Sequence, residues 1–135
     1  MSITASFCTM VTYSARMSQE TVDAERFGRY WAGIIEDFLR AAVRDRDTLP
    51  SSRSVDVRFD EFMADDVAMV ERIYDLAGQP MTDGARAAMQ SFMDEHPRSK
   101  FGGIRYDLAD FGLDPAELRR ALRFYTDRFG VTEES

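Results

Sequence analysis

The sequence predicts a mainly α-helical protein with about five helices and one short strand. Apolar residues recur at helical spacing over most of the chain, capping residues precede these stretches, and one short run alternates with period two. At 135 residues, a single domain over residues 1–135 is expected. Hydrophobic residues are 44% and charged residues 30% of the chain, which excludes a disordered protein.

The first two predicted helices are identified from their stripes of apolar residues. Between Ile3 and Met17, apolar residues at helical spacing predict a buried helix: Ile3, Phe7, Met10, Val11 and Tyr13. Asp23 is a suitable N-cap for a second, longer helix, whose apolar stripe runs from Phe27 to Val43.

The single predicted strand follows Pro50. Val55, Val57 and Phe59 alternate with charged residues, a pattern typical of a half-buried strand. One strand cannot satisfy its own backbone donors and acceptors, so it needs a sheet that this chain hardly supplies. We therefore expect an incomplete domain whose missing sheet lies upstream.

Three further helices are predicted from their start and stop signals. Their N-caps are Asp65 or Asp66, Thr82 or Asp83, and Asp114. Their ends are expected at Gly78, Pro97 and Gly130. In the last helix, Pro115 and Glu117 add the first-turn proline and the returning carboxylate of a capping box.

Charge and composition exclude several classes of function. Seventeen basic and 24 acidic residues give a net charge of -7, which disfavours diffuse binding to nucleic acid or anionic membranes. One cysteine and one histidine exclude an internal disulfide and a zinc site. The adjacent acidic residues at positions 60–61 and 65–66 are explained as helix caps and solvated turns, so we expect no metal. Without a signal peptide or a span of about 18 apolar residues, we expect a soluble cytoplasmic protein.

A basic, glycine-containing segment lies between the last two predicted helices, within residues 96–112. Arg98 and Lys100 offer charge-assisted hydrogen bonds, and Gly102 and Gly103 allow backbone N–H groups to approach a phosphate. The segment therefore predicts a local phosphate or sulfate site. A solvated loop with incidental arginines explains the same composition equally well.

Two residues invite a catalytic interpretation. His96 could act as a general base, but a histidine at a helix C-terminus, favoured by the helix dipole, is the interpretation that we prefer. Ser6 has no His and Asp near it in sequence, so a nucleophilic serine is not expected. We assign no catalytic residue.

Four segments carry a resemblance to a known family. They are SITAS (2–6), RYWAGIIEDFLRA (29–41), VDVRFDEFMADDVAMVERIYDLAGQP (55–80) and HPRSKFGGIRYDLADFGLD (96–114). Their order and spacing resemble the carboxy-terminal portion of the bacterial sulfotransferase family, which transfers a sulfuryl group from 3′-phosphoadenosine 5′-phosphosulfate (PAPS) to an acceptor. The resemblance covers nearly the whole chain and implies the C-terminal part of the α/β P-loop-containing sulfotransferase fold.

The resemblance implies a site for the 3′-phosphate of the donor. In the family, an arginine of an Arg-Asp-Pro motif and a serine about eight residues later hold this phosphate. Ser6 matches the serine, and the arginine would fall just before the first residue. Arg98, Lys100, Gly102 and Gly103 resemble a late basic loop of the family that contacts the same phosphate. The implied cofactor is PAPS, or adenosine 3′,5′-bisphosphate after transfer.

The chain also departs from the family pattern. The phosphosulfate-binding loop and the acceptor-activating base have no counterpart among these residues. Because in-line transfer depends on positioning and on neutralising the transferring group, we expect little or no activity from the isolated chain. Tyr106 and Asp110–Gly112 resemble the exit of the family's basic loop, and we expect them to serve in packing.

Two functions remain open at this point. The first is a sulfotransferase portion that acts on an unknown hydroxyl acceptor, with a complementary N-terminal chain supplying the missing loop. The second is a non-catalytic helical protein-interaction module. In either case, a chain that lacks its sheet should expose apolar surface, so we expect self-association or poor solubility.

Overall fold

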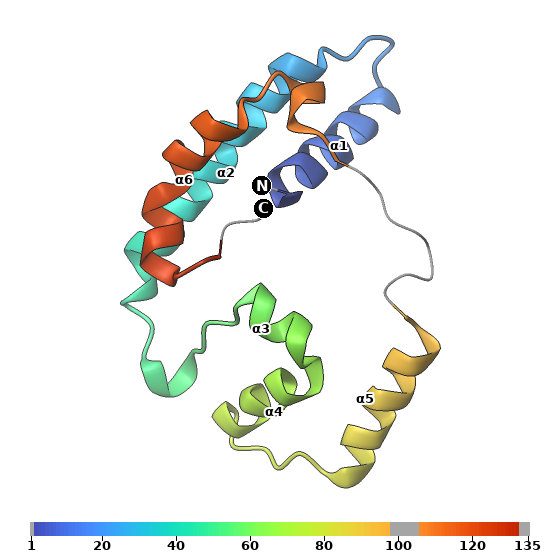
Figure 1. Cartoon of the computed structure of the whole chain (residues 1–135), viewed down its shortest axis with the longest axis vertical. Helices are drawn as coiled ribbons and strands as arrows, with labels where there is room; N and C mark the ends of the chain where they lie inside the picture. The colour runs from blue at the N-terminus through green and yellow to red at the C-terminus, as the bar shows by residue number, and fades with distance from the viewer. Residues whose placement is uncertain (1, 98–105, 133–135) are drawn as a thin grey trace. The chain divides into compact units, whose positions relative to one another are not determined.

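The computed structural model describes residues 2–97 and 106–132. Within these residues, six α-helices, labelled in Figure 1, and two 3₁₀ helices follow one another in this order: α1 (Ser2–Arg16), α2 (Ala24–Arg46), η1 (Ser51–Arg53), α3 (Phe59–Ala64), α4 (Asp66–Leu76), α5 (Asp83–Glu95), η2 (Leu108–Phe111) and α6 (Pro115–Phe129). The mainly α-helical fold class is confirmed. The chain divides into two compact units, which are described separately: unit 1, Met1–Arg46 with Ile104–Ser135, and unit 2, Asp47–Gly103.

The predicted strand is absent from the described residues. Ser54 and Arg58 have extended backbone, with φ/ψ of -146°/142° and -80°/137°. No described segment pairs with residues 55–58, and Phe59 already begins α3. The strand prediction is therefore wrong at this position, because alternating side chains favour an extended chain but a strand also requires a neighbour to accept its backbone hydrogen bonds.

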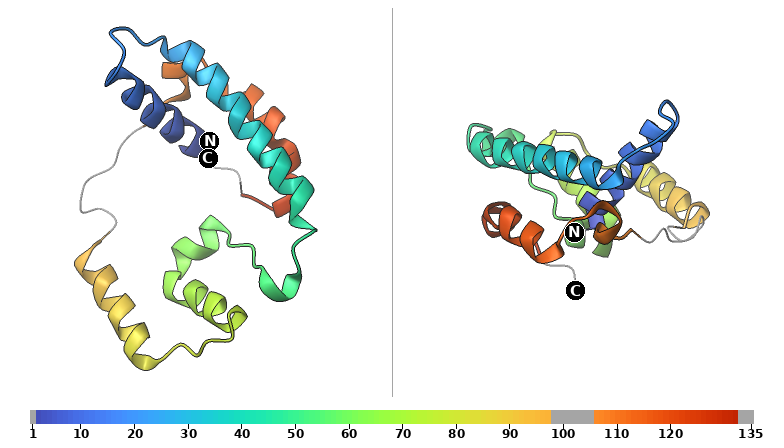
Figure 2. Two further views of the ribbon diagram at one scale, coloured as in Figure 1. Left: turned by 180° about the vertical axis from the view of Figure 1, so that it is seen from behind. Right: turned by 90° about the horizontal axis from the view of Figure 1, so that it is seen from above.

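Unit 1 is built around α2. The helix α1 packs against α2, the 3₁₀ helix η2 contacts both, and α6 runs alongside α2 (Figures 1 and 2). Ala5, Leu108 and Leu118 form its central apolar cluster. Partly buried side chains surround this cluster: Ala32, Tyr106, Leu113 and Leu122.

The contact between α2 and η2 requires a glycine at position 28. Gly28 is buried, and a Cβ atom there would lie 2.5 Å from the carbonyl oxygen and 2.6 Å from the Cβ of Phe111. Phe111 itself is 5% exposed. The packing role expected for residues 110–112 is thus confirmed for Phe111.

The helix α1 places its small residues inward and its large apolar residues outward. The buried face consists of Thr4, Ala5, Cys8 and Thr12, which are at most 4% exposed. Ile3, Met10 and Tyr13, which the periodicity placed in a buried stripe, are 75%, 57% and 66% exposed. The prediction of a fully buried helix is therefore wrong for this face. Small side chains allow α1 to approach α2 and η2 closely, which larger ones would prevent. Burial also raises the pKa of the Cys8 thiol.

The helix boundaries follow the predicted caps. Four side chains accept a hydrogen bond from the backbone N–H three residues later: Asp23 from Arg26 (3.0 Å), Asp65 from Ala68 (2.9 Å), Thr82 from Ala85 (3.2 Å) and Asp114 from Glu117 (2.8 Å). Gly78 and Gly130 adopt the left-handed backbone predicted for helix ends. Of the helices that the structure describes, none is both long and apolar enough to cross a bilayer.

Unit 2 contains η1, α3, α4 and α5. The helix α4 contacts both α3 and α5. Among its described residues, Met69 is the single buried hydrophobic side chain, at 4% exposure. Ion pairs link its helices at the surface: Arg72 with Glu61 at 3.3 Å, and Arg86 with Glu71.

Candidate functional site

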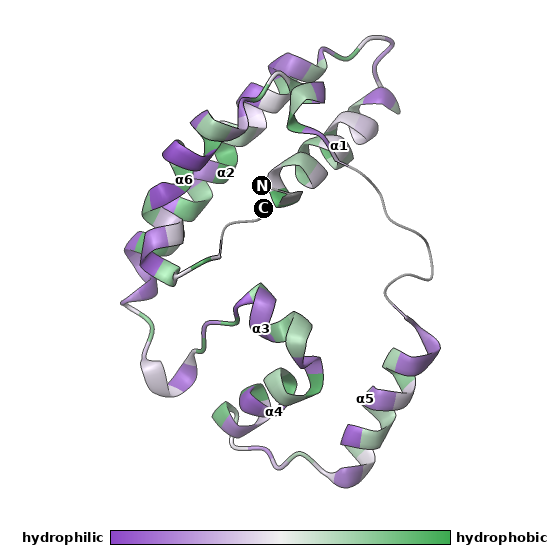
Figure 3. Ribbon diagram, viewed as in Figure 1, coloured by the Kyte–Doolittle hydropathy of each residue, from purple (hydrophilic) through white to green (hydrophobic). Residues whose placement is uncertain are grey.

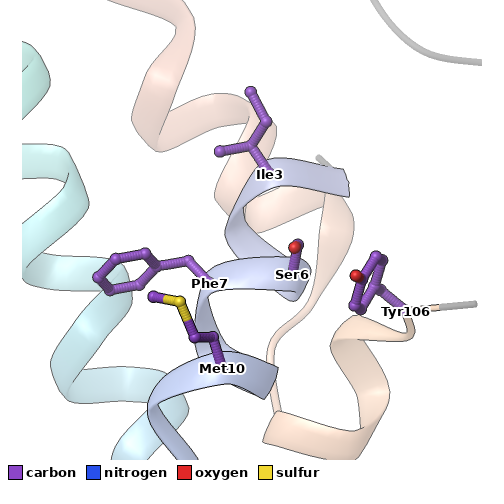
Figure 4. Close-up of a pocket in the computed structure, with 5 residues that line it drawn as sticks. All are labelled: Ile3, Ser6, Phe7, Met10 and Tyr106. Atoms are coloured by element: carbon purple, nitrogen blue, oxygen red, sulfur yellow. The ribbon is translucent and has the colours of Figure 1, made fainter. Parts of the chain in front are cut away.

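Ser6 lies on α1 at the edge of a surface hollow. The hollow has a volume of about 370 Å³, and its lining consists of Ile3, Ser6, Phe7, Met10 and Tyr106 (Figure 4). Ser6 is half-buried. Four of the five lining residues come from one helix, and the fifth comes from the segment that leads into η2.

Local helix geometry explains this arrangement. Residues at positions 3, 6, 7 and 10 of a helix share one side, so α1 forms one wall by its spacing alone. Tyr106 forms the other wall, and it packs against the central cluster of unit 1. In Figure 4, Ser6 and Tyr106 extend into the hollow from these two walls.

The hollow has the size and the polarity of a small-ligand subsite. Its volume falls within the roughly 300–1,000 Å³ of ligand pockets, with apolar walls and two hydroxyl groups. The Ser6 and Tyr106 hydroxyls can each donate one hydrogen bond to a phosphate oxygen. No charged side chain lines the hollow among the residues that the structure describes. A phosphate would therefore find hydrogen bonds here, but its charge must be neutralised by other groups.

The predicted basic segment lies outside the described residues. Arg98, Lys100, Gly102 and Gly103 all fall within residues 98–105, so their approach to Ser6 stays a prediction. Tyr106 is the first described residue after this segment.

His96 is engaged with its own helix. It is the C-cap residue of α5, and its backbone N–H donates to the carbonyl oxygen of Phe92 at 3.0 Å. Its ring stacks on the Phe92 ring with centroids 4.2 Å apart, and Nδ1 lies 2.9 Å from the same carbonyl oxygen. This position is the helix-terminal one that we preferred over a general base.

A second hollow in unit 1 was not predicted from the sequence. It has a volume of about 440 Å³ and is lined by Gln19, Arg26, Phe27, Tyr30 and Trp31. Periodicity assigned Trp31 to the core, but the ring is half-buried and meets Tyr30 edge-on, with centroids 5.4 Å apart. Consecutive residues of a helix point about 100° apart, so Tyr30 and Trp31 face different directions, which is the signal that could have indicated this hollow.

Within residues 2–97 and 106–132, no three His, Cys, Asp or Glu side chains are grouped so that they could hold a metal ion.

Comparison with known proteins identifies similar sequences and structures. Residues 1–83 match the sulfotransferase family, which is more than half of the chain. The crystal structure of sulfotransferase STF9 from Mycobacterium avium matches 98% of this chain, with a TM-score of 0.82 and 25% identity. This chain covers 34% of the STF9 chain, about a third of its length. No curated protein sequence shows a significant match.

Proposed function

Because the chain belongs to the sulfotransferase family, we propose that it holds the 3′-phosphate of the sulfate donor PAPS during sulfuryl transfer to a hydroxyl acceptor. The position of Ser6 is the main support for this proposal. Ser6 falls within the residues that match the family, and its hydroxyl borders a hollow of ligand size. An apolar wall beside a hydroxyl donor suits a ribose phosphate, whose sugar and phosphate require different surroundings.

Each proposed binding residue has a distinct role. Ser6 donates a hydrogen bond to a phosphate oxygen, and Arg98 and Lys100 neutralise the phosphate charge. Gly102 and Gly103 let backbone N–H groups approach the same oxygens. The roles of the last four residues rest on the sequence pattern and on the family resemblance. PAPS, when bound, supplies the activated sulfuryl group.

We propose that these 135 residues alone do not carry out the transfer. They contain no glycine- and serine/threonine-rich loop with a basic residue to bind the phosphosulfate. Since charge neutralisation at the transferring group provides much of the rate enhancement of such reactions, binding without that loop gives little turnover. A complementary N-terminal polypeptide would supply it. Incubation with PAPS and simple alcohols should release adenosine 3′,5′-bisphosphate no faster than a protein-free blank.

Titration calorimetry with adenosine 3′,5′-bisphosphate tests the binding site directly. We expect Ser6→Ala to weaken binding by roughly tenfold or more, because a hydrogen bond to a charged group contributes about 1.5–3 kcal/mol. Arg98→Ala and Lys100→Ala should weaken binding as well. Ser14→Ala is the matched control: Ser14 lies on the same helix, and its hydroxyl is already bonded to the Met10 carbonyl oxygen at 3.0 Å.

Two results would overturn this proposal. The first is no heat at millimolar ligand. The second is heat that Arg98→Ala and Lys100→Ala leave unaltered. Adenosine 5′-monophosphate, which lacks the 3′-phosphate, should bind more weakly than the bisphosphate if the site recognises that group.

A second candidate function is supported by the outward face of α1. A non-catalytic interaction module needs an exposed apolar surface, and Ile3, Met10 and Tyr13 provide one on a single helix. Normal binding of a protein partner together with no response to the nucleotide would favour this candidate.

A further inference from the structure

The second hollow of unit 1 lies where the turn after α1 leads into the first two turns of α2. Its volume is about 440 Å³, and its lining residues are Gln19, Arg26, Phe27, Tyr30 and Trp31. It shares no lining residue with the hollow beside Ser6. In Figure 3, the turn between α1 and α2 carries hydrophilic as well as hydrophobic residues. The nucleotide proposal therefore gives this hollow no role.

Three aromatic rings form the apolar part of the hollow. Around α2, Tyr30 and Trp31 lie on either side of Phe27 and point about 100° apart. The rings of Tyr30 and Trp31 are nearly perpendicular, at 82°, with centroids 5.4 Å apart. Tyr30 is 62% exposed and Trp31 is half-buried, so both are open to a ligand. A flat ring that stacks on one of them meets the other edge-on, and aromatic pairs favour both arrangements.

Arg26 supplies the positive charge of the hollow. Its side chain is exposed and makes no ion pair with another residue that the structure describes. The two carboxylates closest to it in sequence are engaged elsewhere. Glu25 pairs with Arg29 at 3.4 Å, and Asp23 accepts the backbone N–H of Arg26 at 3.0 Å. The guanidinium is therefore available to an anionic ligand, and its parallel N–H groups match the two oxygens of a carboxylate or sulfate.

The charge and the rings lie within reach of one small molecule. Arg26 precedes Tyr30 by four positions, so the two side chains are neighbours on the surface of α2. Gln19, on the facing turn, adds an amide that can both donate and accept a hydrogen bond. Apolar walls with a few polar groups at one end are typical of small-ligand sites.

We propose that this hollow binds a small aromatic anion, whose ring packs against Tyr30 and Trp31 and whose carboxylate or sulfate group binds Arg26. A neutral sugar would also pack on the aromatic rings, but it would leave the charge of Arg26 unused. Because the hollow is open to solvent, a ligand of about ten non-hydrogen atoms should bind with a dissociation constant of roughly 1 mM.

The fluorescence of Trp31 tests this proposal, because Trp31 is the only tryptophan and lines the hollow itself. Phenylacetate, added to the full chain up to about 20 mM at constant ionic strength, should shift the emission to shorter wavelength. It should also protect Trp31 from quenching by acrylamide, which is uncharged. Phenylacetamide has the same shape without the charge and should bind at least threefold more weakly. Acetate, which has no ring, and glucose should have no effect.

Substitutions separate the charge from the rings. Arg26→Gln should lower the affinity for phenylacetate to that for phenylacetamide. Arg29→Gln is the matched control: Arg29 is exposed on the same helix but does not line the hollow, so binding should persist. Tyr30→Ala should weaken the binding of both compounds, because it removes one of the rings. Circular dichroism shows whether each variant keeps its fold.

Four results would each overturn the proposal. They are an unchanged Trp31 emission at about 20 mM phenylacetate, equal affinity for phenylacetate and phenylacetamide, full binding by Arg26→Gln, and a response to glucose in place of phenylacetate. Arg26→Gln should keep the calorimetric response to adenosine 3′,5′-bisphosphate, since Arg26 does not line the hollow beside Ser6. The proposals for the two hollows can therefore fail independently.

Discussion

Unit 1 and unit 2 use the same local signals to begin their helices, but they differ in what holds those helices together. Asp114 caps α6 in unit 1 as Asp65 caps α4 in unit 2. Among the described residues, the buried hydrophobic side chains of unit 1 are Ala5, Cys8, Leu108, Phe111 and Leu118, whereas unit 2 has Met69 alone. The helices of unit 2 are joined by exposed ion pairs instead.

The difference shows that helix formation and packing are specified separately. A cap acts within one turn and needs no distant partner, so it works equally in both units. A core requires side chains from several helices to exclude water together, and exposed ion pairs replace little of that free energy. We therefore expect unit 2 to open more readily than unit 1.

The largest expected effect comes from the core of unit 1. Leu118 is 7% exposed and packs in the cluster with Ala5 and Leu108, so Leu118→Ala should lower the free energy of unfolding by about 2–5 kcal/mol. Urea unfolding followed by the fluorescence of Trp31, the single tryptophan and a residue of unit 1, measures this loss. As the matched change in unit 2, Met69→Ala should lower the helical dichroism signal while the Trp31 transition stays in place. Equal shifts of that transition in both variants would show that the units are not independent.

A smaller effect is expected where α2 meets η2. Gly28→Ala should destabilise unit 1 by about 1–3 kcal/mol, because the added methyl group overlaps Phe111. Gly33→Ala on the same helix has no neighbour within 4 Å of the new Cβ and should stabilise it by about 0.5–1 kcal/mol. The urea midpoints of the two variants should move in opposite directions. Midpoints that move together would contradict the close contact at Gly28.

The smallest effect is expected for the surface ion pairs of unit 2. Arg72→Met removes the 3.3 Å pair with Glu61, whose two side chains are about half exposed, and should cost about 0.2–1 kcal/mol. Thermal unfolding followed by circular dichroism should show this loss at low salt and a reduced loss near 1 M salt. A loss that is larger than that of Leu118→Ala would reverse the comparison between the units.

The helices could be predicted from the sequence because their signals are local. Asp65, Thr82 and Asp114 each act on a backbone N–H three residues away, and Gly78 and Gly130 end helices by their own conformation. The prediction of a strand at residues 55–59 is wrong because alternating side chains do not show whether another strand is available to pair with it. The inward face of α1 was misjudged because small residues pack closely while contributing little to a hydrophobic pattern.

The candidate site was predictable only in part. Ser6 was identified through the resemblance to sulfotransferases, but its neighbour Tyr106 lies 100 positions away and reaches the hollow only through the packing of unit 1. The second hollow depends on the directions in which the rings of Tyr30 and Trp31 point. A hydrophobic pattern counts both residues as apolar and does not show which of them faces outward.

The enclosure of Cys8 gives unit 1 an internal reporter. Its thiol is fully buried and its raised pKa keeps the reactive thiolate scarce, so alkylating and oxidising agents do not reach it in the folded state. Because it is the only cysteine, every labelling event in the native protein records one opening of the contact between α1 and the rest of unit 1. Molecules oxidised at Cys8 would therefore be those that were open when the oxidant arrived.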